Sequence, residues 1–190
     1  ALFNDFKKLI PSLSKAFPDW TLVVRPHPTE NHEVYSKIAE TCGRVRVTND
    51  GSVVPWLLAA KVLVHNGCTT GVEAYAMGVP AITYRKSVNE YYDNGFYRLP
   101  NLLSHQCFSF EELRSTIEKI LAGELGGADG TKRQQAIRSY LSAQDGALAC
   151  ERIVDVLEKM MEGRSDSTQP DVLDRLEGWS VANGRRLLKW

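Results

Sequence analysis

The sequence predicts an α/β fold: a Rossmann-like parallel sheet with helices on both faces, followed by C-terminal helices. Two observations carry this prediction. Over the first 85 residues, short apolar runs alternate with segments of helical periodicity, which is typical of βαβ units. The runs TLVV (21–24) and KVLV (61–64) are almost wholly apolar, as expected for strands that are buried on both faces.

The elements can be placed in order along the chain. Apolar residues at helical spacing predict a first helix over 2–17, and Pro18 ends it. The predicted strands then cover 20–24, 45–50, 61–66 and 80–85. The helices between them cover 31–42, 52–60 and 69–77, and Ser52 is the expected N-cap of the second. This order brings the carboxyl ends of the strands to one edge of the sheet.

The pattern changes after Arg85. Residues 86–110 are polar and aromatic, which predicts a loop with short elements. Further helices are expected over 111–122, 132–142 and 146–161. We therefore expect a nucleotide-binding domain over 1–162, a linker over 163–170 and a last amphipathic helix over 171–190.

The composition restricts the class of protein. Lysine plus arginine and aspartate plus glutamate both number 23, and this zero net charge gives no reason to expect a nucleic-acid partner. The four cysteines have no metal-like spacing, so we expect reduced thiols and a cytoplasmic protein. The basic and aromatic end RRLLKW adds a weaker alternative, peripheral contact with the inner face of the cytoplasmic membrane.

The first candidate site follows the predicted strand 20–24. Here Arg25 and His27 alternate with Pro26 and Pro28, and the prolines restrict the backbone on both sides of the histidine. A cation and a hydrogen-bond donor held in this way suit a phosphate or a nucleotide. The alternative is a proline-stiffened loop with a solvated histidine.

The second candidate site follows the predicted strand 61–66. Small and polar residues lead into the next helix: Asn66, Gly67, Cys68, Thr69, Thr70 and Gly71. Hydroxyl groups beside the free amides of a helix start favour an anion. Glu73, one turn later, would suit ribose hydroxyls.

Each part of the second site also has a structural explanation. Thr69 could act only as a helix cap. Glu73 could form a capping box with Thr70. His65, at the end of the strand, could be a packed core residue.

The segment HNGCTTGVEAYAMGVPAI (65–82) resembles the nucleotide-binding segment in the C-terminal domain of GT-B glycosyltransferases. The matching positions are Gly71, Glu73, Ala74, Gly78 and Pro80. RPHP (25–28) resembles the HP motif of bacterial sialyltransferases, of Kdo transferases and of CDP-glycerol glycerophosphotransferases. In those families a Ser/Thr pair also contacts the phosphate, and Thr69 and Thr70 occupy that place. The resemblance covers about residues 2–110 and is closest to surface carbohydrate biosynthesis proteins.

This resemblance implies a function. The chain would be the donor-binding half of a bacterial glycosyltransferase that moves a sugar from a nucleotide-sugar, CMP-linked as in CMP-Kdo, to a glycan or lipid-linked glycan. The product would be a capsule or lipopolysaccharide. No metal or other cofactor is expected. Asn89, Glu90 and Tyr91 are candidate contacts for the sugar or the acceptor.

The same resemblance assigns no catalytic base to this chain. In GT-B enzymes the base usually lies on an N-terminal domain, which we expect upstream in the full polypeptide, and the helix over 171–190 could cross back to it. Two alternatives remain. UDP-N-acetylglucosamine 2-epimerases share the fold, although they usually carry a second glutamate where Ala74 stands here. A non-catalytic nucleotide-binding or scaffolding domain is the other.

Overall fold

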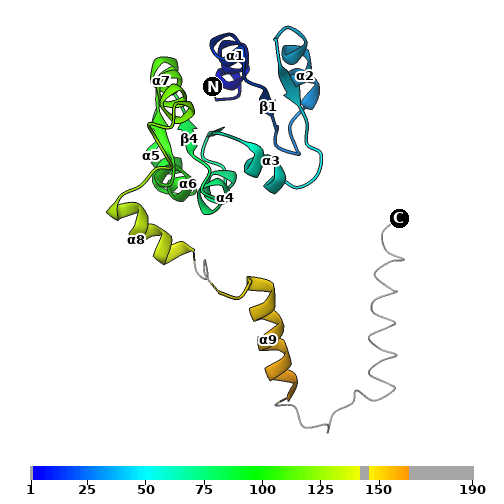
Figure 1. Cartoon of the computed structure of the whole chain (residues 1–190), viewed down its shortest axis with the longest axis vertical. Helices are drawn as coiled ribbons and strands as arrows, with labels where there is room; N and C mark the ends of the chain where they lie inside the picture. Colours follow the sequence, from blue (N-terminus) through cyan, green and yellow to red (C-terminus); the bar gives the residue numbers. More distant parts are fainter. Residues whose placement is uncertain (1, 142–145, 163–190) are drawn as a thin grey trace, which may run out of the picture. The chain divides into compact units, whose positions relative to one another are not determined.

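The computed structural model describes residues 2–141 and 146–162, and it confirms the α/β class. The chain divides into two compact units, Ala1–Ser142 and Ala143–Trp190. All the strands described here belong to the first unit, whose helices and strands alternate along the chain from α1 to β4 (Figure 1). The predicted linker over 163–170 and the predicted helix over 171–190 lie outside the described residues.

The helices and strands of the first unit agree closely with the predicted ranges up to residue 85. They are α1 (Leu2–Ala16), β1 (Leu22–Val24), α2 (His32–Glu40), β2 (Val45–Val47), α3 (Val54–Ala59), β3 (Leu63–His65), α4 (Thr70–Ala76) and β4 (Ala81–Tyr84). The next part contains α5 (Glu90–Asn94), α6 (Arg98–Leu102) and β5 (His105–Cys107), and then α7 (Phe110–Leu121) and α8 (Thr131–Tyr140).

The strands pair in two groups, and every pair is parallel. β1 pairs with β2 in one sheet, and β3, β4 and β5 form the other in that order. β4 is therefore the central strand of the second sheet. Because the three strands run in one direction, the residues that follow β3, β4 and β5 meet at the same sheet edge.

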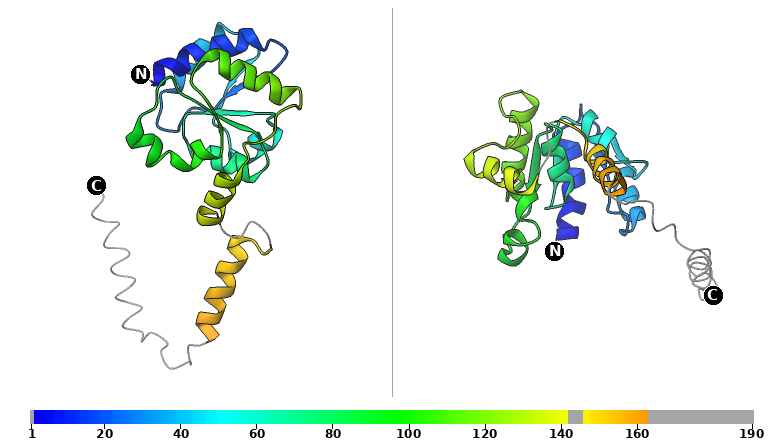
Figure 2. Two further views of the ribbon diagram at one scale, coloured as in Figure 1. Left: turned by 90° about the vertical axis from the view of Figure 1, so that its left-hand side faces the viewer. Right: turned by 90° about the horizontal axis from the view of Figure 1, so that it is seen from below.

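Helices cover both faces of the strands. α1 and α7 lie on one side, and α4 and α6 lie on the other (Figure 2). The first side holds the larger core, in which Leu9 and Leu13 of α1 pack with Ile82 of β4 and Leu113 and Ile117 of α7. The second side has a smaller core of Leu57, Ala74, Val79 and Ala81. Neighbouring residues of β4 thus point to opposite faces and are buried in both.

The predicted burial on both faces is wrong for β1 and only partial for β3. Val23 of β1 is 38% exposed and Trp20 is 43% exposed, whereas Leu63 and Val64 of β3 are half-buried and His65 is buried. The fully buried strand is β4, all four residues of which are buried. Val23 pairs in register with Arg46 of β2, and both residues are exposed. This face of the β1–β2 sheet is therefore open to solvent.

The C-terminal unit contains α9 (Ala149–Glu162), which confirms the predicted helix over 146–161. Within 2–141 and 146–162, no helix is long and apolar enough to cross a membrane.

Candidate functional site

The turn after β3 contains most of the predicted nucleotide-binding residues, and its shape depends on His65. This side chain is 4% exposed. The amide of Gly67 donates to His65 Nδ1 at 2.9 Å. Because an amide can only donate, Nδ1 is the acceptor and the proton of the neutral ring lies on Nε2.

The other nitrogen of His65 continues the hydrogen-bond chain. Nε2 lies 2.8 Å from Ser104 Oγ, and Ser104 in turn donates to the carbonyl of Pro100 at 2.7 Å. Burial, together with the positive charge of Arg85, lowers the pKa of His65 to about 4. The ring is therefore neutral at pH 7, as this chain of donors and acceptors requires. The explanation of His65 as a packed residue at the end of the strand is therefore confirmed.

Two glycines of the turn have steric reasons to be glycine. A Cβ on Gly71 would lie 2.5 Å from His65 Nε2, so α4 can approach the ring only without a side chain there. Gly67 has φ +95°, and a Cβ on it would lie 2.8 Å from Cγ of Tyr97. Both glycines are therefore required for close packing of the turn against His65 and Tyr97, and this requirement does not depend on what the turn binds.

Several polar groups of the turn are unused by the fold. In the described part of the chain, no hydrogen bond occupies the amides of Cys68, Thr69 and Thr70 or the two threonine hydroxyls. Thr69 is the N-cap residue of α4, yet its side chain makes no cap hydrogen bond. The capping explanations for Thr69 and for the Thr70–Glu73 pair are therefore wrong.

Glu73 lies in the first turn of α4 and is half-buried. Among the described residues, its carboxylate has neither a hydrogen bond nor an ion pair. The Gly67 amide, by contrast, is already used by His65 and is not free for a ligand. The three amides at 68–70 are the available ones.

The loop after β1 places Arg25 differently from the expectation of a free cation. Its Nη1 and Nη2 donate to the carbonyls of Asp50 and Gly51 at 3.1 and 3.0 Å. The guanidinium also lies 5.4 Å from the ring centre of Trp56. Arg25 therefore fastens the loop after β1 to the segment between β2 and α3.

His27 is exposed and is held by its own loop. Its Nδ1 accepts from the amide of Thr29 at 3.3 Å and lies 2.7 Å from the Thr29 hydroxyl. Its own amide donates to Glu30 Oε2 at 3.0 Å. Since Nδ1 is an acceptor, the neutral ring presents a donor at Nε2. Pro28, which follows, is exposed as well.

The two candidate sites begin at strands of different sheets. His27 follows β1 and its hydrogen bonds are with Thr29, Glu30 and His32, all within the loop and α2. The turn 66–71 follows β3, and it contacts His65 at the end of β3 and Tyr97, the N-cap residue of α6. The structure thus builds each site separately.

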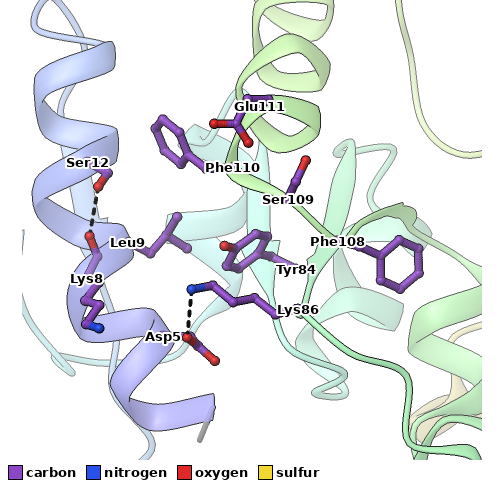
Figure 3. Close-up of a pocket in the computed structure, with 10 residues that line it drawn as sticks. All are labelled: Asp5, Lys8, Leu9, Ser12, Tyr84, Lys86, Phe108, Ser109, Phe110 and Glu111. Atoms are coloured by element: carbon purple, nitrogen blue, oxygen red, sulfur yellow. Dashed lines mark hydrogen bonds and ion pairs between the residues drawn. The ribbon is translucent and has the colours of Figure 1, made fainter.

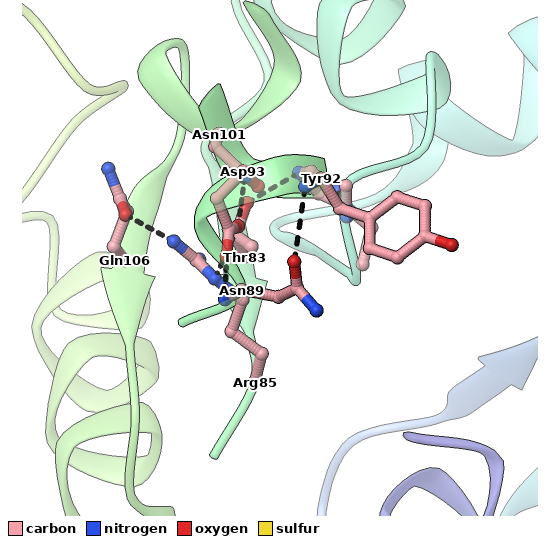
Figure 4. A network of polar contacts seen from close by, with 9 residues as sticks. Thr83, Arg85, Asn89, Tyr92, Asp93, Asn101 and Gln106 are labelled. Atoms are coloured by element: carbon pink, nitrogen blue, oxygen red, sulfur yellow. Dashed lines mark hydrogen bonds and ion pairs between the residues drawn. The ribbon is translucent and has the colours of Figure 1, made fainter. Parts of the chain in front are cut away.

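The third group of candidates surrounds a buried ion pair (Figure 4). Arg85 Nε lies 2.8 Å from Asp93 Oδ1, and both side chains are about nine-tenths buried. Asn101 donates to the same oxygen of Asp93 at 2.7 Å, and Arg85 Nη2 donates to Gln106 at 2.8 Å. The network joins the end of β4 to α5, α6 and β5.

The predicted contact residues 89–91 divide by role. Asn89 is the N-cap of α5, where its side chain accepts from the Tyr92 amide and its amide donates to Asp93. Glu90 is exposed, and Tyr91 is 82% exposed with its ring edge against Tyr92. Of these three, only Glu90 and Tyr91 remain on the surface with no part in the network.

Sequence reasoning missed Arg85, Tyr97 and Ser104 as determinants of this region. Arg85 gave a signal, because a cation ends an otherwise apolar strand. Tyr97 and Ser104 gave none, since each contacts residues that are 30 or more positions away.

Within residues 2–141 and 146–162, no three His, Cys, Asp or Glu side chains are grouped as metal ligands would be. Comparisons with protein-family models, with curated proteins and with solved structures give no match.

Proposed function

We propose that this chain is the donor-nucleotide-binding half of a GT-B glycosyltransferase, which transfers a sugar from a nucleotide-sugar to a surface polysaccharide. The observation that carries the proposal is the set of unused groups in the turn after β3. Three amides and two hydroxyls at Cys68, Thr69 and Thr70 have no partner within the described chain. Such donors suit phosphate oxygens.

The remaining roles follow from position. His27 would donate from Nε2 to the phosphate, and the free carboxylate of Glu73 would accept from the ribose hydroxyls. Arg25 acts as a positioning residue, because its guanidinium is bound to two backbone carbonyls. In this proposal the phosphate oxygens accept hydrogen bonds from protein donors, and no metal is required.

The class of donor rests on the resemblance of RPHP to the HP motif. We propose a CMP-linked sugar such as CMP-Kdo, so that a single phosphate lies in the turn. The acceptor would bind to an N-terminal domain of the full polypeptide, and the same domain would supply the general base.

Calorimetry with CMP, CDP and UDP tests the proposal. We expect CMP to bind best, His27→Ala to weaken binding by about 10- to 100-fold, and Glu73→Gln to weaken it as well, since each removes a hydrogen bond with a charged group. His105→Ala is the matched control, because this histidine bonds to the carbonyl of Gly126 and lies at neither candidate site.

Three results would contradict the proposal. If the chain binds none of the three nucleotides at millimolar concentration, the result would favour a scaffolding domain. Conversion of UDP-N-acetylglucosamine by the full polypeptide without an acceptor would favour an epimerase. CMP affinity that His27→Ala and Glu73→Gln leave unchanged would place the nucleotide elsewhere.

A further inference from the structure

The apolar residues of α9 lie on one face of the helix. At about 100° per residue, its eight apolar residues occupy slightly less than half of the circumference, and its six charged residues occupy the rest. No residue of α9 is buried among the described residues. The large apolar side chains of this face are between 49% and 72% exposed: Ile153, Val154, Val156, Leu157, Met160 and Met161.

A helix of this length depends on packing for its stability. Isolated helices shorter than about 12–15 residues are marginally stable in water, and α9 has 14 residues. Most of the stability of a helix in a protein comes from burial of its apolar face against another surface. We therefore expect α9 to persist in solution only when another surface covers its apolar face.

The charge of α9 disfavours a membrane as the covering surface. The helix carries four acidic residues and two basic ones, Arg152 and Lys159, which gives a net charge of −2. Helices that lie on anionic membranes have a polar face rich in lysine and arginine. The polar face of α9 would instead be repelled by anionic lipid headgroups.

The size of the face disfavours a second copy of α9. A helix of 14 residues is about 21 Å long and about 10 Å wide. Two such faces, projected flat, would bury on the order of 400 Å² in total, whereas specific interfaces between separate proteins bury roughly 1,200–2,000 Å². A covering surface in the same chain avoids most of the entropic cost of association.

The groove of the first unit is unsuited to an apolar helix face. It lies between α1, the end of β4 and the start of α7 (Figure 3). Lys8 and Glu111 border it, together with the ion pair between Lys86 and Asp5 at 3.1 Å. An apolar face in this groove would remove water from these charged groups, which is unfavourable.

The chain has a second amphipathic segment shortly after α9. Residues 171–190 lie outside the described residues, and their sequence predicts an amphipathic helix. On a helical projection, all seven charged residues of this segment lie outside one third of the circumference. That third contains six apolar residues, Val172, Leu173, Leu176, Trp179, Leu187 and Trp190.

The connection between the two segments is long enough for them to lie side by side. Residues 163–170 can span up to roughly 27 Å, whereas the axes of packed helices are about 8–10 Å apart. Connections of this length commonly join antiparallel helices. A segment tethered so closely meets its partner at an effective concentration in the millimolar range, so a small contact area is sufficient.

We propose that residues 171–190 cover the apolar face of α9 as the second helix of an antiparallel helical hairpin. Leu157 and Ile153, in the middle of the α9 face, would pack against Leu176 and Trp179. The charged faces of both helices would remain in water. The hairpin requires no nucleotide and would form whatever the first unit binds.

Hydrogen–deuterium exchange of the full chain tests the hairpin. We expect the amides of α9 to be protected at every protein concentration, because the covering segment belongs to the same chain. Leu176→Asp places a charge in the middle of the covering face. It should speed the exchange of α9 by about 10- to 100-fold, the effect of losing one buried leucine.

Two further variants complete the test. Leu188→Asp is the matched control, because it makes the same substitution outside the apolar third of the segment, and its α9 should exchange as in the parent. Leu157→Asp is the reciprocal change on α9. It should speed the exchange of residues 171–190, because each helix stabilises the other by the same contact.

Four results would overturn the proposal. Exchange of the parent's α9 at the rate of an unfolded chain would mean that nothing covers the face. Protection that Leu176→Asp leaves intact would mean that a different surface covers it. Protection that rises with protein concentration, together with a dimer in sedimentation velocity, would identify a second copy. Protection that requires vesicles of phosphatidylcholine and phosphatidylglycerol would identify a membrane.

Discussion

The amide of Gly67 donates a hydrogen bond to Nδ1 of His65, two residues earlier in the chain, at 2.9 Å. The contact turns the chain sharply after β3 and directs Nε2 toward Ser104. It explains why a histidine that looks like a ligand residue is buried and neutral. The turn is therefore fixed from inside, and its outer groups remain free.

Stability should depend on pH through His65. Its folded pKa of about 4 lies below the ordinary value of 6.5, so the unfolded chain takes up the proton first as the pH falls. This contribution is complete above pH 6.5 and is lost down to about pH 4, at a cost of about 3 kcal/mol. Urea unfolding of the parent and of His65→Gln at pH 7, 5.5 and 4.5 measures it. As the pH falls from 7 to 4.5, His65→Gln should lose less stability than the parent. Equal losses would show that His65 is not the group responsible for the pH dependence.

Gly71→Ala should destabilise the protein by about 1–3 kcal/mol, the usual cost of overpacking. The new Cβ would lie 2.5 Å from His65 Nε2. Gly43→Ala is the control, since nothing lies within 4 Å of its Cβ. In a double-mutant cycle with His65→Ala, the cost of Gly71→Ala should shrink. An undiminished cost would mean that the clash is with another group.

Ser104→Ala should cost about 1–3 kcal/mol, because it leaves His65 Nε2–H and the Pro100 carbonyl without their shared partner. Ser139→Ala, at an exposed site of α8, should change the free energy of unfolding by less than about 0.5 kcal/mol. Denaturant titration compares the two. Equal losses of unfolding free energy in the two variants would show that the hydrogen bonds of the Ser104 hydroxyl do not stabilise the fold.

Asp93→Asn should cost about 3–5 kcal/mol, because it leaves the Arg85 guanidinium buried without its counter-charge. The exposed pair Arg114–Glu118 has the same separation of 2.8 Å, and Glu118→Gln should cost under about 1 kcal/mol. Thermal unfolding of the two variants gives the comparison. A small loss for Asp93→Asn would mean that water or another group screens Arg85.

The sequence predicts the fold well where the signal is local. Apolar runs marked four of the five strands because each is bounded by turn residues or by a helix. β5 was missed because His105, Gln106 and Cys107 carry no apolar alternation, and its place depends on pairing with β4. The helices α5 and α6 have only five residues each, too few for a helical period to be recognised.

In the candidate site, too, local features could be predicted from the sequence and contacts between distant residues could not. The small and polar residues of the turn could be recognised because their preference for a strand-to-helix turn is local. The partners of Arg25 could not, since they are backbone carbonyls at Asp50 and Gly51, and any residue has one. The dependence of Gly71 on His65 was equally hidden, because it is a matter of distance between two packed elements.

The bond between His65 and Ser104 has a consequence for the order of folding. Its partners are 39 positions apart in the chain, and Tyr97, which covers Gly67, comes from the same later segment. β3 and α4 are complete in the polypeptide long before this segment has been made. A nascent chain that ends before residue 97 therefore holds the whole turn 66–71 in sequence and lacks the contacts that shape it. During synthesis, the turn would take its final shape only when the segment 97–104, which includes α6, has emerged and docked.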